Sequence, residues 1–292
     1  MGKLALAAAA SAVLLASVPT SSHAEPLRVV AAENFYGDLV RQIGGPDVNV
    51  TSILTNPNQD PHAFEASPST ARAIADAELI VYSGADYDPW MEKLLSVSKS
   101  STRRIVVVAN LLHRKSGDNP HLWYDPASMP AVAKALASEL EANDPVHKAD
   151  FEGRLAVFLN SLQAMDQRID AMRRRYAGLE VTATEPVFGY MAEALGFKMR
   201  NGGFQTAVMN GTEPSASQVA AFENDLKNRT VKLLFYNSQV TDDLTARLLK
   251  LAKASGVPVV GVSETEPPGT IYQDWMTGQL DALNKALSGE GS

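Results

Sequence analysis

The sequence predicts an α/β protein of two lobes, each a mostly parallel sheet flanked by helices, joined by one long rigid helix. Two observations support this prediction. Short β-branched runs alternate with helical stretches in both halves of the chain, as in parallel sheets covered on both faces. A stretch near the middle keeps apolar residues at three- and four-residue steps, which indicates a helix. With 292 residues and 45% apolar content, the chain is long enough for two lobes.

Residues 25–144 form the predicted N-terminal lobe. Its first strand, 27–33, precedes a helix over 34–45 that ends on two glycines. The same alternation continues through the rest of this lobe. It predicts strands over 48–54, 78–84 and 103–109, and helices over 68–77 and 88–97.

Residues 145–177 are predicted to form the joining helix. This segment has no Gly or Pro after Gly153. Its apolar residues at helical spacing are Phe151, Leu155, Phe158, Leu162, Met165, Ile169 and Met172. At about 1.5 Å per residue the helix would reach roughly 45 Å, which is more than one small lobe requires. We therefore expect it to run along both lobes and to join them rigidly.

Residues 178–292 form the predicted C-terminal lobe, in which the alternation of strands and helices resumes. The predicted strands cover 179–185, 231–237 and 257–263. The predicted helices cover 187–196, 215–228, 241–256 and 272–287.

Residues 1–24 have the pattern of a signal peptide. Lys3 supplies a basic start, an apolar run follows over 4–18, and Ser22 and Ala24 are small residues at the cleavage positions. No other stretch approaches the roughly 20 apolar residues that span a membrane. The chain has no Cys, so we expect neither disulfides nor a lipidated N-terminal Cys. We expect a periplasmic protein that begins near Glu25 and does not insert into the membrane.

The charge balance argues against nucleic acid as a partner. The formal net charge is −7 and the pI is near 5.3. Affinity for nucleic acid depends on many Lys or Arg contacts to phosphates, and this composition does not favour such a surface.

Two of the five histidines stand in similar turns. His62 follows Asp60-Pro61, and His121 follows Asn119-Pro120, each after an α/β unit where ligands of open sheets bind. The Pro stiffens each turn, and a metal ligand requires such rigid presentation. Spacing alone equally allows two unrelated turn histidines that cap neighbouring helices.

The other three histidines have simpler interpretations. His23 lies in the predicted signal peptide. His147 stands beside Lys148 near the start of the joining helix, where a solvated surface residue is the simplest interpretation. His113 lies in a short segment without further histidines, and we interpret it as part of an ordinary surface loop.

Four motifs in order along the chain carry a family resemblance. They are "DPHAFEASP" (60–68), "NPHLWYDP" (119–126), "FGYMAEALG" (188–196) and "TEPSASQVAAF" (212–222). Together with the long helix between the second and third, they resemble the periplasmic metal-binding solute-binding proteins of ATP-driven (ABC) zinc and manganese importers. The resemblance covers essentially the whole chain after the signal peptide.

The resemblance implies a metal site between the lobes with four protein ligands. His62 and His121 match the pair from the first lobe. Zinc-type members have a His shortly before the Phe-Gly-Tyr motif, whereas this chain has Glu185 there, as manganese-type members do. Hard oxygen donors suit Mn²⁺ better than a third imidazole would. An alternative is that Glu185 only stabilises the start of the following helix.

The fourth ligand position departs from the family pattern. Family members usually have an Asp just after the last strand, whereas this chain has Ser263, Glu264, Thr265 and Glu266. Glu264 is the first candidate and Glu266 the second, Ser263 stays open, and either acid could be a solvated loop residue. The expected ligand set is His62, His121, Glu185 and Glu264.

The resemblance implies a receptor that captures one divalent transition metal ion, Mn²⁺ or Zn²⁺, as cargo and delivers it to an ABC permease. We expect the protein to be a monomer. We also expect that it is not an enzyme, because four protein ligands leave no open coordination position at which the metal could activate water. The rigid helix suggests release through small loop movements. The alternatives are an exported metallohydrolase, which lacks support because no H-E-x-x-H or G-x-S-x-G motif occurs, and a periplasmic metal chaperone of the same fold.

Overall fold

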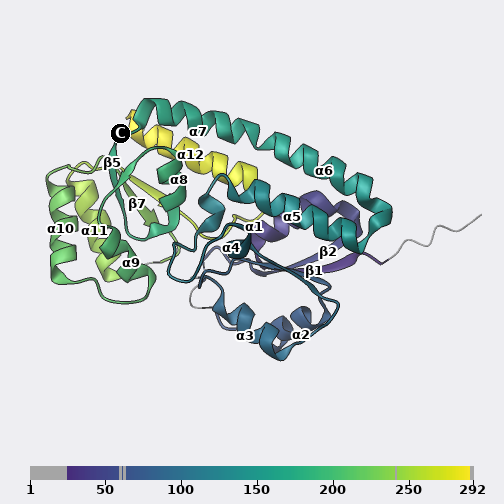
Figure 1. Ribbon diagram of the computed structural model, residues 1–292. Helices are drawn as coiled ribbons and strands as arrows, with labels where there is room; N and C mark the ends of the chain where they lie inside the picture. The colour runs from purple at the N-terminus through teal and green to yellow at the C-terminus, as the bar shows by residue number, and fades with distance from the viewer. Residues whose placement is uncertain (1–24, 59–60, 62–63, 241, 290–292) are drawn as a thin grey trace, which may run out of the picture.

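The computed structural model describes residues 25–58, 61, 64–240 and 242–289, so the predicted signal peptide lies outside the described residues. Two four-stranded parallel sheets form the centres of two lobes (Figure 1). The predicted α/β class and the two-lobed arrangement are confirmed. In the part of the chain that the structure describes, none of the helices is both long and apolar enough to cross a membrane.

The first sheet has the strand order β2-β1-β3-β4. Its strands are β1 (Leu27–Glu33), β2 (Val48–Leu54), β3 (Leu79–Tyr82) and β4 (Arg104–Val107). All three pairings are parallel, and Val29 lies opposite Val50 on one side and Leu79 on the other. Parallel pairing directs the carboxyl ends of these strands to one edge of the sheet.

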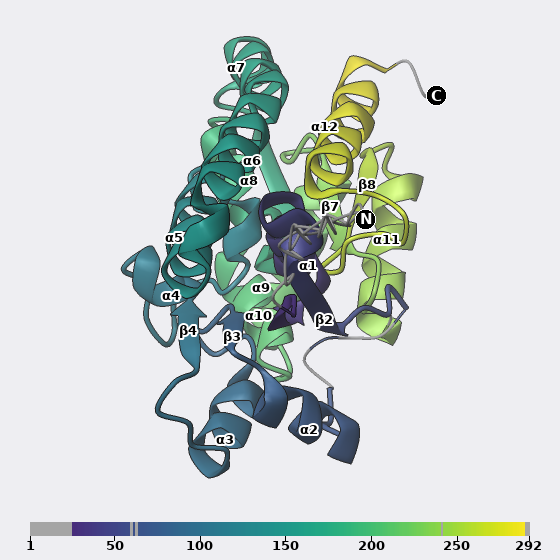
Figure 2. The same ribbon diagram turned by 90° about the vertical axis from the view of Figure 1, so that its right-hand side faces the viewer.

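Helices cover both faces of the first sheet because its central strand is apolar on both sides. Val29 and Ala31 pack toward α1 (Asn34–Gly44) and α5 (Ser128–Asn143). Val30 and Ala32 pack toward Ile74 and Met91, which lie in α2 (Pro68–Asp76) and α3 (Pro89–Val97). Figure 2 shows α2 and α3 on the side of the sheet opposite α5. A short helix, α4 (Val108–Leu111), follows β4.

The second sheet repeats this plan with the order β6-β5-β7-β8. Its strands are β5 (Glu180–Ala183), β6 (Lys198–Met199), β7 (Leu234–Asn237) and β8 (Val259–Val262). Phe235 and Val260 face α8 (Gly189–Ala194) and α12 (Tyr272–Ser288). The other face carries a separate apolar cluster. That cluster includes residues of α9 (Gly202–Met209), α10 (Ala216–Lys227) and α11 (Asp243–Ala254).

The predicted joining helix is two helices in line rather than one. A 3₁₀ turn, η4 (Pro145–His147), leads into α6 (Lys148–Ser161), and α7 (Gln163–Tyr176) follows after Leu162 (Figure 1). The Ser161 hydroxyl donates to the Phe158 carbonyl and accepts from Gln273, so a side chain competes with the helix at the break. Leu162 keeps helical dihedral angles, with φ −72° and ψ −19°, so the direction continues.

The two halves of this segment contact different lobes. Helix α6 packs against α1 and α5 of the first lobe, and α7 packs against α12 of the second. One apolar core accordingly extends through both lobes. Within it, Trp123 stacks near Phe35 with ring centroids 4.6 Å apart, and Tyr124 and Phe188 continue toward the second sheet. Trp123, Tyr124 and Trp275 are all buried in this core.

Helices α4, α5 and α9 and strand β6 are not among the elements that the sequence predicts, and α4 replaces the end of the strand predicted over 103–109. Helix α5 contains Pro130, a residue type that usually breaks helices and therefore argues against a helix in the sequence. It is tolerated here because it lies in the first turn. Helix α9 begins with Gly202 and Gly203 after a left-handed Asn201, a composition that indicates a loop. Strand β6 has two residues, too few to show a periodic pattern.

Candidate metal site

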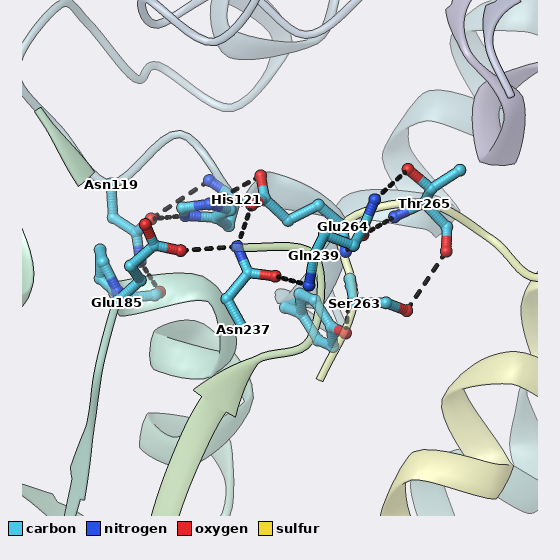
Figure 3. A network of polar contacts seen from close by, with 10 residues as sticks. Asn119, His121, Glu185, Asn237, Gln239, Ser263, Glu264 and Thr265 are labelled. Carbon is cyan, nitrogen blue, oxygen red and sulfur yellow. Dashed lines mark hydrogen bonds and ion pairs between the residues drawn. The ribbon is translucent and has the colours of Figure 1, made fainter. Parts of the chain in front are cut away.

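The candidate site lies where strands of the second sheet end and the first lobe meets them. Glu185 follows β5, Asn237 is the last residue of β7, and Glu264 follows β8. His121 approaches from the first lobe, directly before the 3₁₀ turn η3 (Leu122–Tyr124) (Figure 3). The parallel order β5-β7-β8 brings the three second-lobe positions together, at the edge where open α/β sheets bind ligands.

His121 is fully buried and held in one orientation by Asn119. The Asn119 amide nitrogen donates to the Pro186 carbonyl at 2.8 Å, so its oxygen must be the acceptor for His121 Nδ1 at 2.7 Å. Nδ1 therefore carries a proton, and Nε2 is the nitrogen that faces the site. Histidine ligands of metal ions are commonly oriented by such a hydrogen bond to the other ring nitrogen.

Glu264 is the acid that His121 faces. The distance from His121 Nε2 to Glu264 Oε2 is 3.2 Å, and the side chains of both residues are at most 1% exposed. Gln239 anchors the loop that carries Glu264, because its side-chain oxygen accepts the amides of Glu264 at 2.5 Å and Thr265 at 3.0 Å. A carboxylate and an imidazole from opposite lobes thus meet in a buried contact.

Glu185 lies on the other side of Asn237. It precedes the 3₁₀ turn η5 (Pro186–Phe188), but its side chain makes no capping hydrogen bond there. The structure therefore does not support the alternative that Glu185 serves as a cap of the following helix. Its Oε2 instead accepts from Asn237 Nδ2 at 2.6 Å. The same Nδ2 donates to Glu264 Oε1 at 2.5 Å, so one amide joins the two carboxylates (Figure 3).

The other two candidates for the fourth position have different partners. The main chain of Glu266 exchanges two hydrogen bonds with the Asn34 side chain, and the residue lines a surface pocket with Arg41. Burial raises the pKa of Glu266 to about 8, and the charge of Asp38 adds to the rise. The Ser263 hydroxyl accepts from Trp275 Nε1 at 3.2 Å. Of the three candidates, Glu264 is the one paired with His121.

The structure links His121, Glu264 and Glu185 by pairwise contacts, the last two through Asn237, and His62 lies outside the described residues. Within the described ranges, no three His, Cys, Asp or Glu side chains are grouped closely enough to hold a metal ion. The complete ligand set is therefore a proposal. Two further histidines lie where the sequence predicts: His113 is exposed in a loop, and His147 is at the surface, where it pairs with Asp144 at 2.6 Å. His23 lies outside the described residues.

Sequence reasoning missed the three amides that organise this site. Asn119 orients His121, Gln239 anchors the Glu264 loop, and Asn237 joins the carboxylates. The signal for Asn237 is its position, because a buried polar residue at the carboxyl end of a strand is where ligands of α/β sheets are found. Asn119 stands two residues before His121 within the Asn-Pro-His turn, which is a further local signal.

A buried pair of acids lies at the carboxyl end of the first sheet. Glu33 and Asp88 are both 1% exposed, and the oxygens of Asp88 accept the amides of Ser83 and Gly84 at 2.7 and 2.8 Å. Burial raises the pKa of Glu33 well above its usual range, and the charge of Asp88 adds to the rise. Burial also raises the pKa of Asp88, to about 6.

This pair predicts a loss of stability with rising pH. Both acids hold protons more tightly in the folded chain, so their contribution is complete below about pH 4 and is lost as the pH passes the raised values, about 6 for Asp88. We expect Glu33→Gln to flatten this dependence and to stabilise the metal-free protein at pH 7.5. Urea unfolding from pH 5 to 8 measures it, with the exposed Glu193→Gln as control. An unchanged slope in Glu33→Gln would contradict the assignment.

Comparison with known proteins agrees with this architecture. A model of the family described as zinc-uptake complex component A, periplasmic, matches residues 29–286. The high-affinity zinc uptake system protein of Paracoccus denitrificans is 22% identical, over 96% of this chain and 98% of that protein. A manganese ABC transporter substrate-binding lipoprotein of Streptococcus mitis is 24% identical, over 90% of each chain.

A solved structure shares the fold. The periplasmic zinc binding protein from Treponema pallidum superposes with a TM-score of 0.76 at 24% identity, over 90% of this chain and 99% of that chain. The likeness includes both lobes, since the match covers nearly the whole of that protein.

Proposed function

Because the chain belongs to the family of the periplasmic component A of zinc-uptake complexes, we propose that it binds one divalent transition metal ion through His62, His121, Glu185 and Glu264. The family consists of substrate-binding receptors of ABC importers rather than enzymes, and the chain is such a receptor. The metallohydrolase and chaperone alternatives are accordingly set aside. We further propose that the mature protein is a periplasmic monomer that hands its ion to a membrane permease.

The observation that carries the proposed site is the buried contact between the lobes. His121 Nε2 and Glu264 Oε2 are 3.2 Å apart, and Glu185 approaches the same place through Asn237. Burying two carboxylates side by side is costly unless a positive charge compensates them. A divalent cation between the lobes supplies that charge. Two imidazoles and two carboxylates are donors that Zn²⁺ and Mn²⁺ both accept.

Delivery of the ion requires hydrogen bonds between the lobes to break. The loop with Glu264 is bonded to the first lobe through Asn34 and through Tyr124, whose hydroxyl donates to the Ser263 carbonyl at 2.8 Å. The segment after Glu185 is bonded to Asn119 at 2.8 Å. These bonds and the shared core support release by local loop movement rather than wide opening of the lobes.

We expect the metal-stripped protein to bind Zn²⁺ and Mn²⁺ at the same single site, with Zn²⁺ the tighter. The Irving–Williams order favours Zn²⁺ over Mn²⁺ for nitrogen and oxygen ligands, so affinity in the test tube does not by itself identify the physiological cargo. Isothermal titration with each ion after chelator treatment gives stoichiometry and affinity, and titration of Zn²⁺ into Mn²⁺-loaded protein tests competition. Binding of neither ion, or binding of both at once, would contradict the proposed site.

A further inference from the structure

We propose that Asn237 determines which metal ion the site prefers, by holding one oxygen of each carboxylate ligand so that each acid turns its second oxygen toward the ion. This inference rests on the proposed function and adds a residue that does not itself bind the ion. Asn237 is 1% exposed at the end of β7, between the strands that precede Glu185 and Glu264.

The orientation of the Asn237 side chain follows from its hydrogen bonds. Its oxygen accepts the backbone amide of Gln239 at 3.0 Å, and a backbone amide can only donate. The nitrogen must therefore face the carboxylates, where it donates to Glu185 at 2.6 Å and to Glu264 at 2.5 Å. An Asn side chain has two such hydrogens, so both are used, one for each acid.

The particular oxygens that Asn237 holds decide what each acid can offer. On Glu264 it holds Oε1, while Oε2 is the atom that lies 3.2 Å from His121 Nε2. On Glu185 it holds Oε2, which leaves Oε1 as the oxygen to turn toward the ion. A hydrogen bond to one oxygen uses one of its lone pairs and fixes the plane of the carboxylate, which favours binding of an ion through the other oxygen.

Single-oxygen binding by both acids favours a small coordination number. Two imidazole nitrogens and two oxygens make the four-coordinate set that Zn²⁺ prefers. Mn²⁺ prefers more oxygen donors, which two-oxygen binding by a carboxylate would supply. A neutral amide also leaves both negative charges to attract the cation, whereas a Lys at this position would neutralise one of them. Asn237 therefore orients both carboxylates and favours binding of the ion through one oxygen of each.

A graded series of variants tests this inference. Asn237→Ser keeps one donor, and Asn237→Ala keeps none. We expect Zn²⁺ binding to weaken about 10- to 100-fold in the Ala variant, the usual cost of losing a group that orients a ligand, with the Ser variant in between. We expect a smaller loss for Mn²⁺, because the released oxygens compensate, so the ratio of the two affinities falls. Titration calorimetry of both ions measures the ratio.

The visible absorption of bound Co²⁺ reports its coordination number. It would not change if Asn237 only contributed to the stability of the fold. Four-coordinate Co²⁺ absorbs visible light much more strongly than five- or six-coordinate Co²⁺. We expect strong absorption in the unmodified protein, weaker absorption in Asn237→Ser and the weakest in Asn237→Ala. Ser238→Ala is the matched control, because Ser238 is the next residue and donates to the Val262 carbonyl rather than to either acid.

The outcomes separate this inference from the proposed function. If the unmodified protein binds none of the three ions, the proposed function fails. If it binds them but the folded Asn237 variants keep the Co²⁺ spectrum and the ratio of Zn²⁺ to Mn²⁺ affinity, the role of Asn237 is wrong and the site stands. If Asn237→Ala does not fold, Asn237→Ser gives the same test with one donor retained.

Discussion

His121→Ala is expected to weaken Zn²⁺ binding by more than about 100-fold. The imidazole is a proposed ligand, so its loss should exceed the 10- to 100-fold cost of losing a group that only orients a ligand. The imidazole is also fully buried, and the hydrogen bond from its Nδ1 to the Asn119 side-chain oxygen, at 2.7 Å, fixes its orientation. A water molecule in its place would not be oriented by this bond. Titration calorimetry of the metal-stripped variant measures the loss, and His62→Ala should produce a loss of similar size.

His113→Ala is the matched control for both histidine variants. His113 is exposed in a loop only a few residues before His121, and it makes no part of the proposed site. We expect the His113→Ala variant to bind Zn²⁺ with the same affinity as the unmodified protein. Unchanged tight binding in His121→Ala and His62→Ala, with both variants folded, would show that the ligand set is wrong.

Trp123→Ala is expected to lower the free energy of unfolding by about 3–5 kcal/mol, the range for removal of a large aromatic side chain from a core. Trp123 is fully buried, and its ring lies 4.6 Å from that of Phe35 and 4.8 Å from that of Tyr87. Domains are typically stable by only 5–15 kcal/mol, so this loss would be a large part of the total. Urea unfolding of the metal-free protein measures it.

The same substitution should also weaken metal binding. The His121 ring packs against Trp123 at 5.4 Å with an interplanar angle of 70°, so the ligand loses a wall that holds it. Leu155→Ala is the control, since Leu155 lies in α6 and is only partly buried. We expect a clearly smaller loss of stability and unchanged metal affinity for it. Equal effects in the two variants would contradict the central role of Trp123.

Most of the fold could be predicted because its signals are local. The strand β1 is apolar on both sides, and α1 follows at once with Phe35, Leu39 and Ile43 on one face, so a covered parallel sheet follows from spacing. The last helix begins at Tyr272, where the sequence places it. The break at Leu162 could not be predicted, because it involves a hydrogen bond from Gln273, more than a hundred residues later in the chain.

By itself, then, the sequence determined the two-lobed α/β class, the presence of two X-Pro-His motifs and the presence of acids after the strands that became β5 and β8. The tertiary structure decided which residue faces His121. Ser263, Glu264 and Glu266 all lie in the loop after β8, but only the side chain of Glu264 is paired with His121 among the described contacts of these three residues. The tertiary structure also decided the role of Asn237, whose partners stand 52 and 27 residues away. Hydrophobic spacing is a property of neighbours in the chain, whereas the direction of a buried polar side chain depends on partners that only the strand order brings together.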